Sequence, residues 1–242
     1  MHLTWNINPE ELDKWRKFVD ANISNDFVKD REERNLLRTE VDLSKDKLWY
    51  VHVGCQVTTQ QRSGPNSSVS KFMDSSSPAL NYEKCKKAKN LEELIQRELE
   101  KAGLRRFKTI ASFLTRILND LENGGWKELE VKLKSIEPDT TKEKEQEVAN
   151  YISQNFPGLG LKQSRNYIQW LGLARYEIPL DSRVTRTLRM LNCSFVPKAG
   201  ALSDESVYLL VQSGLQLIAS KLNIYPCILD ACIFSSYDEK QA

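Results

Sequence analysis

Apolar residues recur at helical spacing along most of the chain. The first stripe follows the segment Asn8-Pro9-Glu10-Glu11, which supplies a capping side chain, a proline for the first helical position and two acids for the positive helix end. No comparable alternation of apolar and polar residues favours strands, so the pattern predicts an all-α fold. The main stripes are Leu12, Trp15, Phe18 and Val19; Leu91, Leu94, Ile95 and Leu99; Ile110, Phe113, Leu114, Ile117, Leu118 and Leu121; Val148, Tyr151 and Ile152; Val184, Leu188 and Leu191; Val207, Leu210, Val211, Leu215 and Ile218.

The segment from Leu48 to Val57 does not fit this pattern. It is rich in strand-forming residues, yet apolar and polar positions do not alternate along it. Propensity therefore leaves a buried strand and a helix as open alternatives.

A glycine-rich turn separates two helical patterns in the second half of the chain. The first pattern ends at Asn155, the second begins at Leu161, and Phe156-Pro157-Gly158-Leu159-Gly160 lies between them. Two glycines around one apolar residue let the backbone turn tightly and approach a ligand closely. The following helix presents unpaired N–H groups and its positive end. This arrangement predicts a phosphate site, such as one that holds a DNA strand by its backbone.

Positive charge is concentrated near this turn. The whole chain carries 35 Lys and Arg against 33 Asp and Glu, a net charge of +2. Between Phe156 and Lys198, seven basic residues stand against two acids, which gives +5 locally and leaves −3 for the remainder. This partition favours a polyanionic partner at the turn. The alternative is that Arg183, Arg186 and Arg189 form one solvated helix face.

The composition excludes several classes of protein. With 40% hydrophobic and 28% charged residues, the chain is neither fully disordered nor fibrous. No apolar run is long enough to cross a bilayer, so we expect a cytoplasmic protein without a membrane partner. The five cysteines are irregularly spaced and fit neither a disulfide framework nor a zinc site. We expect His52 to pack or to cap, and not to ligate a metal.

Two segments together resemble the helix-hairpin-helix DNA glycosylases with the Gly-Pro-Asp signature. Phe156-Pro157-Gly158-Leu159-Gly160-Leu161-Lys162 is similar to the family's hairpin, which usually has leucine in place of Phe156. Ile178-Pro179-Leu180-Asp181-Ser182-Arg183 is similar to the segment that carries the family's essential aspartate. The interval from Lys162 to Asp181 resembles the 8-oxoguanine branch in particular, and the length of 242 residues is more like that of its compact or archaeal-type members. Val57-Thr58-Thr59-Gln60-Gln61 looks like the end of the family's first internal helix, and this likeness favours a helix over a strand at Leu48 to Val57.

The resemblance implies two helical domains with an active site in the cleft between them. The internal domain would span residues 46–177 and end in the helix-hairpin-helix motif, and residues 1–45 and 178–242 would form the second domain. No cofactor is expected to be required. An iron–sulfur cluster is not expected, because Cys227 and Cys232 lack closely spaced companions. Some relatives hold Na⁺ or K⁺ through hairpin carbonyls, which here would be those of Gln154, Phe156 and Leu159.

The resemblance also implies a chemistry, that of a bifunctional DNA glycosylase and abasic-site lyase in base excision repair. Such an enzyme, expected here as a monomer, excises 8-oxoguanine from double-stranded DNA. Lys162 would attack C1′ of the extruded nucleotide and form a Schiff base, from which β-elimination nicks the strand. Asp181 would stabilise the cationic sugar and move protons. The residues alone also allow a solvated Lys162 and an Asp181 that merely caps the next helix.

The resemblance further implies which residues would touch DNA. Asp230 and Phe234 would hydrogen-bond to the extruded base and stack on it, although core packing is the competing interpretation of Phe234. A non-catalytic helix-hairpin-helix DNA-binding protein and a monofunctional glycosylase of different base specificity remain alternatives, and Lys162 distinguishes them. The expected DNA contacts are Gly158, Leu159, Gly160, Ser164, Arg165 and Arg183 around the hairpin, and Gln60, Gln61 and Arg62 at the end of the first internal helix. For these last three residues, an ordinary polar helix end is the competing interpretation.

Overall fold

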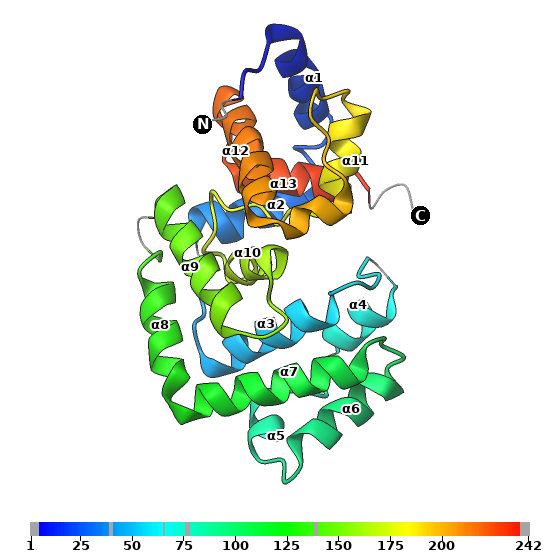
Figure 1. The fold of residues 1–242 in the computed structure, drawn as a ribbon, viewed down its shortest axis with the longest axis vertical. Helices are drawn as coiled ribbons and strands as arrows, with labels where there is room; N and C mark the ends of the chain where they lie inside the picture. The colour runs from blue at the N-terminus through cyan, green and yellow to red at the C-terminus, as the bar shows by residue number, and fades with distance from the viewer. Residues whose placement is uncertain (1–4, 39–40, 65, 76–77, 138–139, 238–242) are drawn as a thin grey trace.

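The structure, a computed structural model, describes residues 5–38, 41–64, 66–75, 78–137 and 140–237 (Figure 1). Every regular element in these ranges is helical and no strand is formed there, so the all-α prediction is confirmed. The elements are α1 (Pro9–Asp20), α2 (Asp26–Glu32), the π-helical turn η1 (Glu33–Leu37), α3 (Lys45–Val57), α4 (Ser68–Met73), α5 (Tyr82–Lys86), α6 (Leu91–Lys101), α7 (Phe107–Asp120), the π-helical turn η2 (Leu121–Gly125), α8 (Trp126–Lys134), α9 (Lys142–Asn155), α10 (Leu161–Trp170), α11 (Ser182–Met190), the 3-10 turn η3 (Ala199–Ser203), α12 (Glu205–Lys221) and α13 (Pro226–Ser235).

Short polar side chains start many of these helices. The Asn8 amide oxygen accepts the N–H of Glu11 at 2.8 Å, and the Glu11 carboxylate accepts the N–H of Asn8 in return. Such a reciprocal cap satisfies backbone donors that have no partner within the helix. Ser44 and Asp204 cap α3 and α12 in a similar way, each through one side-chain oxygen.

The first hydrophobic core lies in the lower part of Figure 1, around α3, α7 and α10. Helix α3 is buried from Leu48 to Val57 almost without interruption. A helix enclosed on all sides needs no polar stripe, and this explains why its sequence shows neither helical nor strand periodicity. The helix implied by the resemblance is the correct alternative. At Gly54, a side chain would come within 2.4 Å of Trp170, because α3 and α10 pack closely there.

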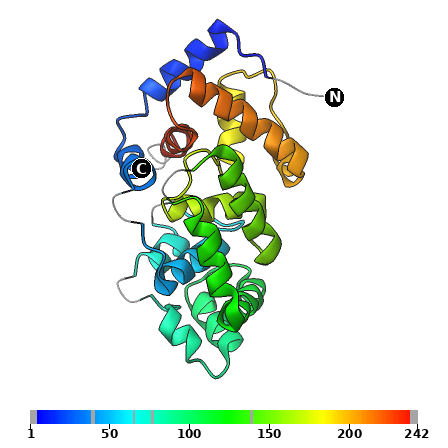
Figure 2. The ribbon, with the colours of Figure 1, turned by 90° about the vertical axis from the view of Figure 1, so that its left-hand side faces the viewer.

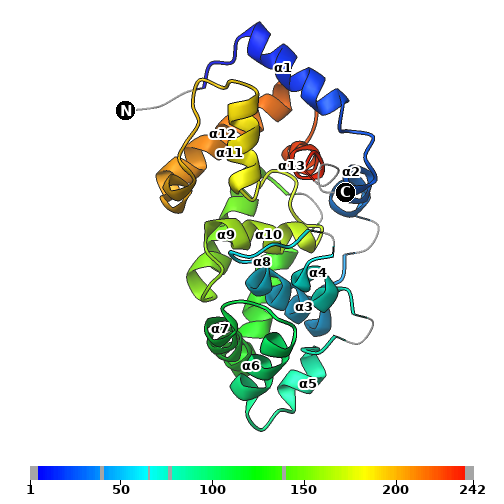
Figure 3. The ribbon, with the colours of Figure 1, turned by 90° about the vertical axis from the view of Figure 1, so that its right-hand side faces the viewer.

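The second core lies above the first and is built from both ends of the chain (Figures 1 and 2). It draws on residues 15–28 and 178–233, whereas the first core draws on residues 48–174. We call the part of the protein around the first core the lower body and the part around the second core the upper body. Helices α2 and α13 pack beside each other on the side of the upper body that faces the lower body (Figure 3). We retain the boundaries predicted from the sequence, 46–177 against 1–45 and 178–242, as a proposed division into domains.

His52 packs inside the first core. Its ring centroid lies 4.8 Å from that of Phe156 and 4.5 Å from that of Tyr167. The side chain is fully buried, and this burial lowers the pKa of His52 to about 3. The prediction that this histidine packs is therefore confirmed.

Within the described ranges, no single helix is long and apolar enough to cross a membrane. Helices α12 and α13 reach that length and composition only when they are counted together, and a bend of 100° separates them.

Candidate active site

The glycine turn forms a hairpin between α9 and α10. Leu159 is fully buried in the first core, where it anchors the turn. Gly158 has a φ of +80°, and the nearby Gln56 side chain donates a hydrogen bond to the carbonyl of Pro157 at 2.7 Å. At Gly160, α10 begins without a side-chain cap. The first N–H groups of α10 are therefore available to an external acceptor, as a phosphate site requires.

The two glycines of the hairpin have different physical roles, which substitution by alanine separates. A Cβ at Gly158 would lie 2.6 Å from both Gln56 and Phe113 in a left-handed backbone, whereas a Cβ at Gly160 would meet no described atom within 4 Å beyond its own chain neighbours. We expect Gly158→Ala to lower the free energy of unfolding by about 2 kcal/mol. Gly160→Ala should leave it nearly unchanged. Urea unfolding of both variants tests this difference, and equal losses would contradict the assignment.

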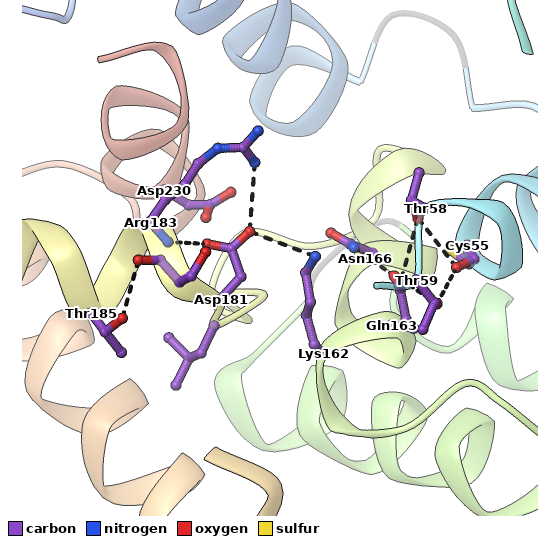
Figure 4. Close-up of polar contacts among 12 residues, drawn as sticks. Cys55, Thr58, Thr59, Lys162, Gln163, Asn166, Asp181, Arg183, Thr185 and Asp230 are labelled. Atoms are coloured by element: carbon purple, nitrogen blue, oxygen red, sulfur yellow. Dashed lines mark hydrogen bonds and ion pairs between the residues drawn. The ribbon is translucent and has the colours of Figure 1, made fainter. Parts of the chain in front are cut away.

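Lys162 and Asp181 face each other across the gap between the two bodies (Figure 4). The Lys162 Nζ lies 3.6 Å from Asp181 Oδ2, and the two side chains are 34% and 23% exposed. Asp181 also caps α11, because its Oδ1 accepts the N–H of Arg183 at 2.7 Å. The capping interpretation is therefore correct, and it leaves the second carboxylate oxygen free to face the amine.

Arg183 adds a second cation to this carboxylate. Its Nη1 lies 3.5 Å from Asp181 Oδ2, so this oxygen is shared between Arg183 and Lys162 (Figure 4). The site thus combines an amine that solvent can reach with an anion held on a helix terminus. These are the elements of nucleophilic catalysis in which a neighbouring group handles protons.

A cavity of about 680 Å³ surrounds this pair. Its volume falls within the usual range for pockets that hold small ligands. The walls come from α3, α4 and α10 of the lower body and from α2, α11 and α13 of the upper body. Lys162, Asp181, Arg183, Asp230 and Phe234 all line it.

Asp230 is a buried residue of the cavity lining. Its Oδ2 is 3.1 Å from the guanidinium of Arg31 and accepts the side-chain N–H of Gln169 at 3.0 Å. Burial raises the pKa of Asp230, and Arg31 opposes this shift. The predicted base contact thus forms part of a buried polar group whose other members come from α2 and α10.

Phe234 is covered on both faces. Its ring stacks on Phe27 with centroids 4.7 Å apart and planes inclined by 16°, and the Arg183 guanidinium lies 3.9 Å from its centroid. A parallel ring and a guanidinium at these distances would overlap if both lay on the same face of Phe234. Phe27 and Arg183 therefore lie on opposite faces. A base could stack on Phe234 only after Phe27 or Arg183 moves away.

Two of the predicted DNA contacts, Arg165 and Ser164, are wrong as side-chain contacts, because both side chains are fully buried. Arg165 is fully buried and pairs with Glu177 at 2.7 Å, and its guanidinium lies over the ring of Tyr208. Ser164 is also fully buried, and its hydroxyl accepts a hydrogen bond from Arg165. Both side chains support the fold behind the hairpin, and neither faces the cavity or the solvent.

The polar residues after α3 form a braced loop. Gln60 is exposed with a φ of +57°, and its carbonyl accepts a hydrogen bond from the Arg105 side chain at 2.8 Å. The Gln61 amide accepts the N–H of Arg105 at 2.9 Å and donates to the carbonyl of Val57. Arg62 is exposed. Gln60 and Arg62 are accessible as predicted DNA contacts require, whereas the Gln61 side chain is engaged in bracing the loop.

Sequence reasoning missed a polar cluster beside Lys162. The Gln163 amide donates to the hydroxyls of Thr58 and Thr59 at 3.2 and 2.8 Å and accepts a hydrogen bond from Asn166 at 2.7 Å (Figure 4). This cluster ties the end of α3 to the first turn of α10. Gln163 directly follows Lys162 in the sequence, and this adjacency is the signal that could have pointed to the cluster.

The hairpin carbonyls remain a candidate cation site. The carbonyl of Phe156 accepts the N–H of Leu159 at 3.1 Å, which leaves one lone pair for a further partner. A monovalent cation at the carbonyls of Gln154, Phe156 and Leu159 stays a prediction. In the described part of the chain, no three His, Cys, Asp or Glu side chains are grouped so that they could hold a metal.

Comparison with known proteins places this geometry in a known fold. No protein-family model and no curated protein sequence matches the chain. Among solved structures, the 8-oxoguanine DNA glycosylase of Methanocaldococcus jannaschii is similar with a TM-score of 0.68 and 16% identity, over 93% of this chain and 92% of that one.

Two further structures agree. The 8-oxoguanine glycosylase/lyase of M. jannaschii in complex with a 15mer DNA containing 8-oxoguanine has a TM-score of 0.67 and 14% identity, over 94% of this chain and 97% of that one. The 8-oxoguanine DNA glycosylase of Thermotoga maritima has a TM-score of 0.65 and 18% identity, over 93% and 97%. The resemblance inferred from the hairpin and the aspartate segment therefore extends to the whole structure, and the chain has the fold of the 8-oxoguanine DNA glycosylases.

Proposed function

We propose that the protein is a DNA glycosylase with abasic-site lyase activity that excises 8-oxoguanine from double-stranded DNA during base excision repair. The observation that carries this proposal is the approach of the Lys162 amine to the Asp181 carboxylate, 3.6 Å apart, at the rim of a large interdomain cavity. The shared fold supports it, since one solved structure of this fold is a glycosylase/lyase in complex with DNA containing 8-oxoguanine.

The hairpin and the basic residues around the cavity would hold the DNA backbone. The uncapped start of α10 offers N–H groups to a phosphate, and Arg183 adds a cation to the lining of the cavity. A base inside the duplex shields its own glycosidic bond, so the nucleotide must be extruded into the cavity at a cost of a few kcal/mol. Asp230 would then present a carboxylate oxygen to the edge of the base.

Lys162 would perform the covalent step. Its neutral amine forms a bond to C1′ while the bond from C1′ to the base breaks, and the base leaves with the electron pair and takes up a proton. Opening of the sugar ring gives the Schiff base. Loss of a C2′ proton and departure of the 3′ phosphate then cut the strand, and hydrolysis of the Schiff base frees Lys162.

Asp181 would serve the same step electrostatically. Its carboxylate can take the proton that the Lys162 ammonium must lose and pass it to the departing base. The carboxylate restored in this way lies where it can oppose the positive charge on the sugar. Because Asp181 is fixed as the cap of α11, it needs little reorganisation during the reaction.

A cleavage assay on matched duplexes tests the proposal. We expect the protein to nick a duplex at a single 8-oxoguanine without alkali, and hot alkali should reveal few further sites. Duplexes with guanine or uracil at the same position are the controls. Binding without any cleavage would indicate a non-catalytic DNA-binding protein. Cleavage only after alkali would indicate a monofunctional enzyme that uses water, and cleavage only at uracil would indicate a different base specificity.

A further inference from the structure

Tyr208 makes two hydrogen bonds to the backbone just ahead of Asp181. This residue of α12 is buried, with 1% of its surface exposed. Its hydroxyl donates to the carbonyl of Ile178 at 2.8 Å and accepts the N–H of Leu180 at 2.9 Å. A single hydroxyl thus binds two backbone groups that are two residues apart in the sequence. Both lie just ahead of Asp181, the residue that faces Lys162.

The earlier part of this connection is fixed by other groups. We call residues 171–181, which join α10 to α11, the strap. The buried carboxylate of Glu145 in α9 accepts the backbone N–H groups of Arg175, Tyr176 and Glu177 at 2.7, 2.8 and 2.9 Å. Glu145 thus holds residues 175–177 of the strap, and Tyr208 holds the residues that follow them.

The same tyrosine ring also contacts the helix of the proposed nucleophile. The guanidinium of Arg165, three residues after Lys162 in α10, lies 4.9 Å from the centroid of the Tyr208 ring. Arg165 pairs with Glu177 of the strap, and Glu177 accepts a hydrogen bond from Gln212 of α12 at 2.7 Å. Helix α10, the strap and α12 therefore meet around Tyr208.

We propose that Tyr208 is a positioning residue, which sets Asp181 relative to Lys162 through its hydroxyl. The proposal rests on the proposed function. Asp181 starts α11, so a shift of Ile178 and Leu180 moves the carboxylate with them. A displacement of about 1 Å in a catalytic group can slow a reaction by about 100-fold.

Tyr208→Phe is the variant that removes this contact with the least disturbance. It keeps the ring beneath Arg165 and deletes both hydrogen bonds to the strap. Tyr167→Phe is the matched control, because Tyr167 is also fully buried and its hydroxyl donates to the carbonyl of Leu48 at 3.3 Å, inside the first core. Both variants lose one buried hydroxyl, but of these two hydroxyls it is that of Tyr208 which bonds to the strap.

The first readout separates chemistry from binding. With enzyme in excess over the 8-oxoguanine duplex, we expect Tyr208→Phe to slow excision by about 10- to 100-fold. The Kd for DNA should be unchanged, and Tyr167→Phe should remain close to wild type in both measurements. An excision rate of Tyr208→Phe equal to that of the control would overturn the proposal.

A double-mutant cycle tests whether Tyr208 acts through Asp181. In an Asp181→Asn background, with slow excision followed over hours, the additional loss from Tyr208→Phe should largely disappear. A merely structural role predicts the same fold loss in both backgrounds, and that result would overturn the proposal.

Hydrogen exchange tests the positioning without any activity. The Leu180 amide should exchange at least 10-fold faster in Tyr208→Phe than in wild type or in Tyr167→Phe. Unchanged exchange overturns the proposal, whereas a wild-type protein that excises no lesion overturns only the proposed function. If Tyr208→Phe does not fold, the α-hydroxy analogue of leucine at position 180 removes the same N–H donor, and the same losses are expected.

Discussion

Lys162→Gln is expected to abolish both strand cleavage at 8-oxoguanine and the covalent adduct that borohydride traps. The amide keeps most of the length of the side chain but has no amine to attack C1′. Because Lys162 is about one third exposed and its ion pair with Asp181 is 3.6 Å long, the fold should tolerate the change. Gel analysis of borohydride-treated reactions measures the adduct, and a binding assay should show that the variant still holds the duplex.

A second lysine provides the control. Lys198 belongs to the same basic segment and is exposed, so Lys198→Gln removes one charge without touching the cavity. It should weaken DNA binding slightly and leave the adduct intact. Persistence of the adduct in Lys162→Gln would show that another amine is the nucleophile.

Asp181→Asn is expected to slow base excision by about 100- to 1000-fold while DNA affinity is retained. Asparagine caps helices as well as aspartate does, so the cap of α11 should survive. The variant loses the negative charge that faces Lys162 and that would oppose the cation developing on the sugar. Single-turnover excision and direct binding, measured on the same duplex, separate the two effects.

Asp204→Asn is the matched substitution for this test. Asp204 caps α12, and its Oδ1 accepts the N–H of Val207 at 3.1 Å, outside the cavity. If Asp181 serves only as a cap, both variants will behave alike and excise at the wild-type rate. Such an outcome would remove Asp181 from the mechanism.

Helices with one apolar face were predictable from the sequence, and the enclosed helix was not. The stripe of α7 places Ile110, Leu114 and Ile117 in the core at the spacing that the period of 3.6 requires. Helix α3 is buried on all sides, so its sequence carries no such period. Its assignment came from the resemblance of the segment that follows it.

The approach of Lys162 to Asp181 was predictable because the motif places both residues in one short stretch. Lys162 lies in the first turn of α10 and Asp181 caps the next helix, α11. The strap between these helices is long enough to return along α10, so that the two helix starts can meet. The other walls of the cavity come from distant segments. Arg31 reaches Asp230 across 199 positions of sequence, and no local pattern announces such a contact.

Charge counting located the basic segment but misread one member. Arg165 and Glu177 neutralise each other inside the protein, so removal of both leaves six basic residues and one acid, and the local excess is still +5. Burial, which composition cannot show, decides that Arg165 is structural. Exposed cations such as Arg186, Arg189 and Lys198 carry the positive surface.

The central claim is that the amine of Lys162 attacks the sugar, and the most direct test locates the covalent bond. Wild-type protein should be reduced with borohydride on an 8-oxoguanine duplex, digested with nuclease and protease, and mapped by mass spectrometry. We predict a deoxyribose remnant on the peptide that contains Lys162, attached at that residue. Cleavage at 8-oxoguanine without any adduct, or an adduct on another lysine or on the N-terminal amine, would contradict the account.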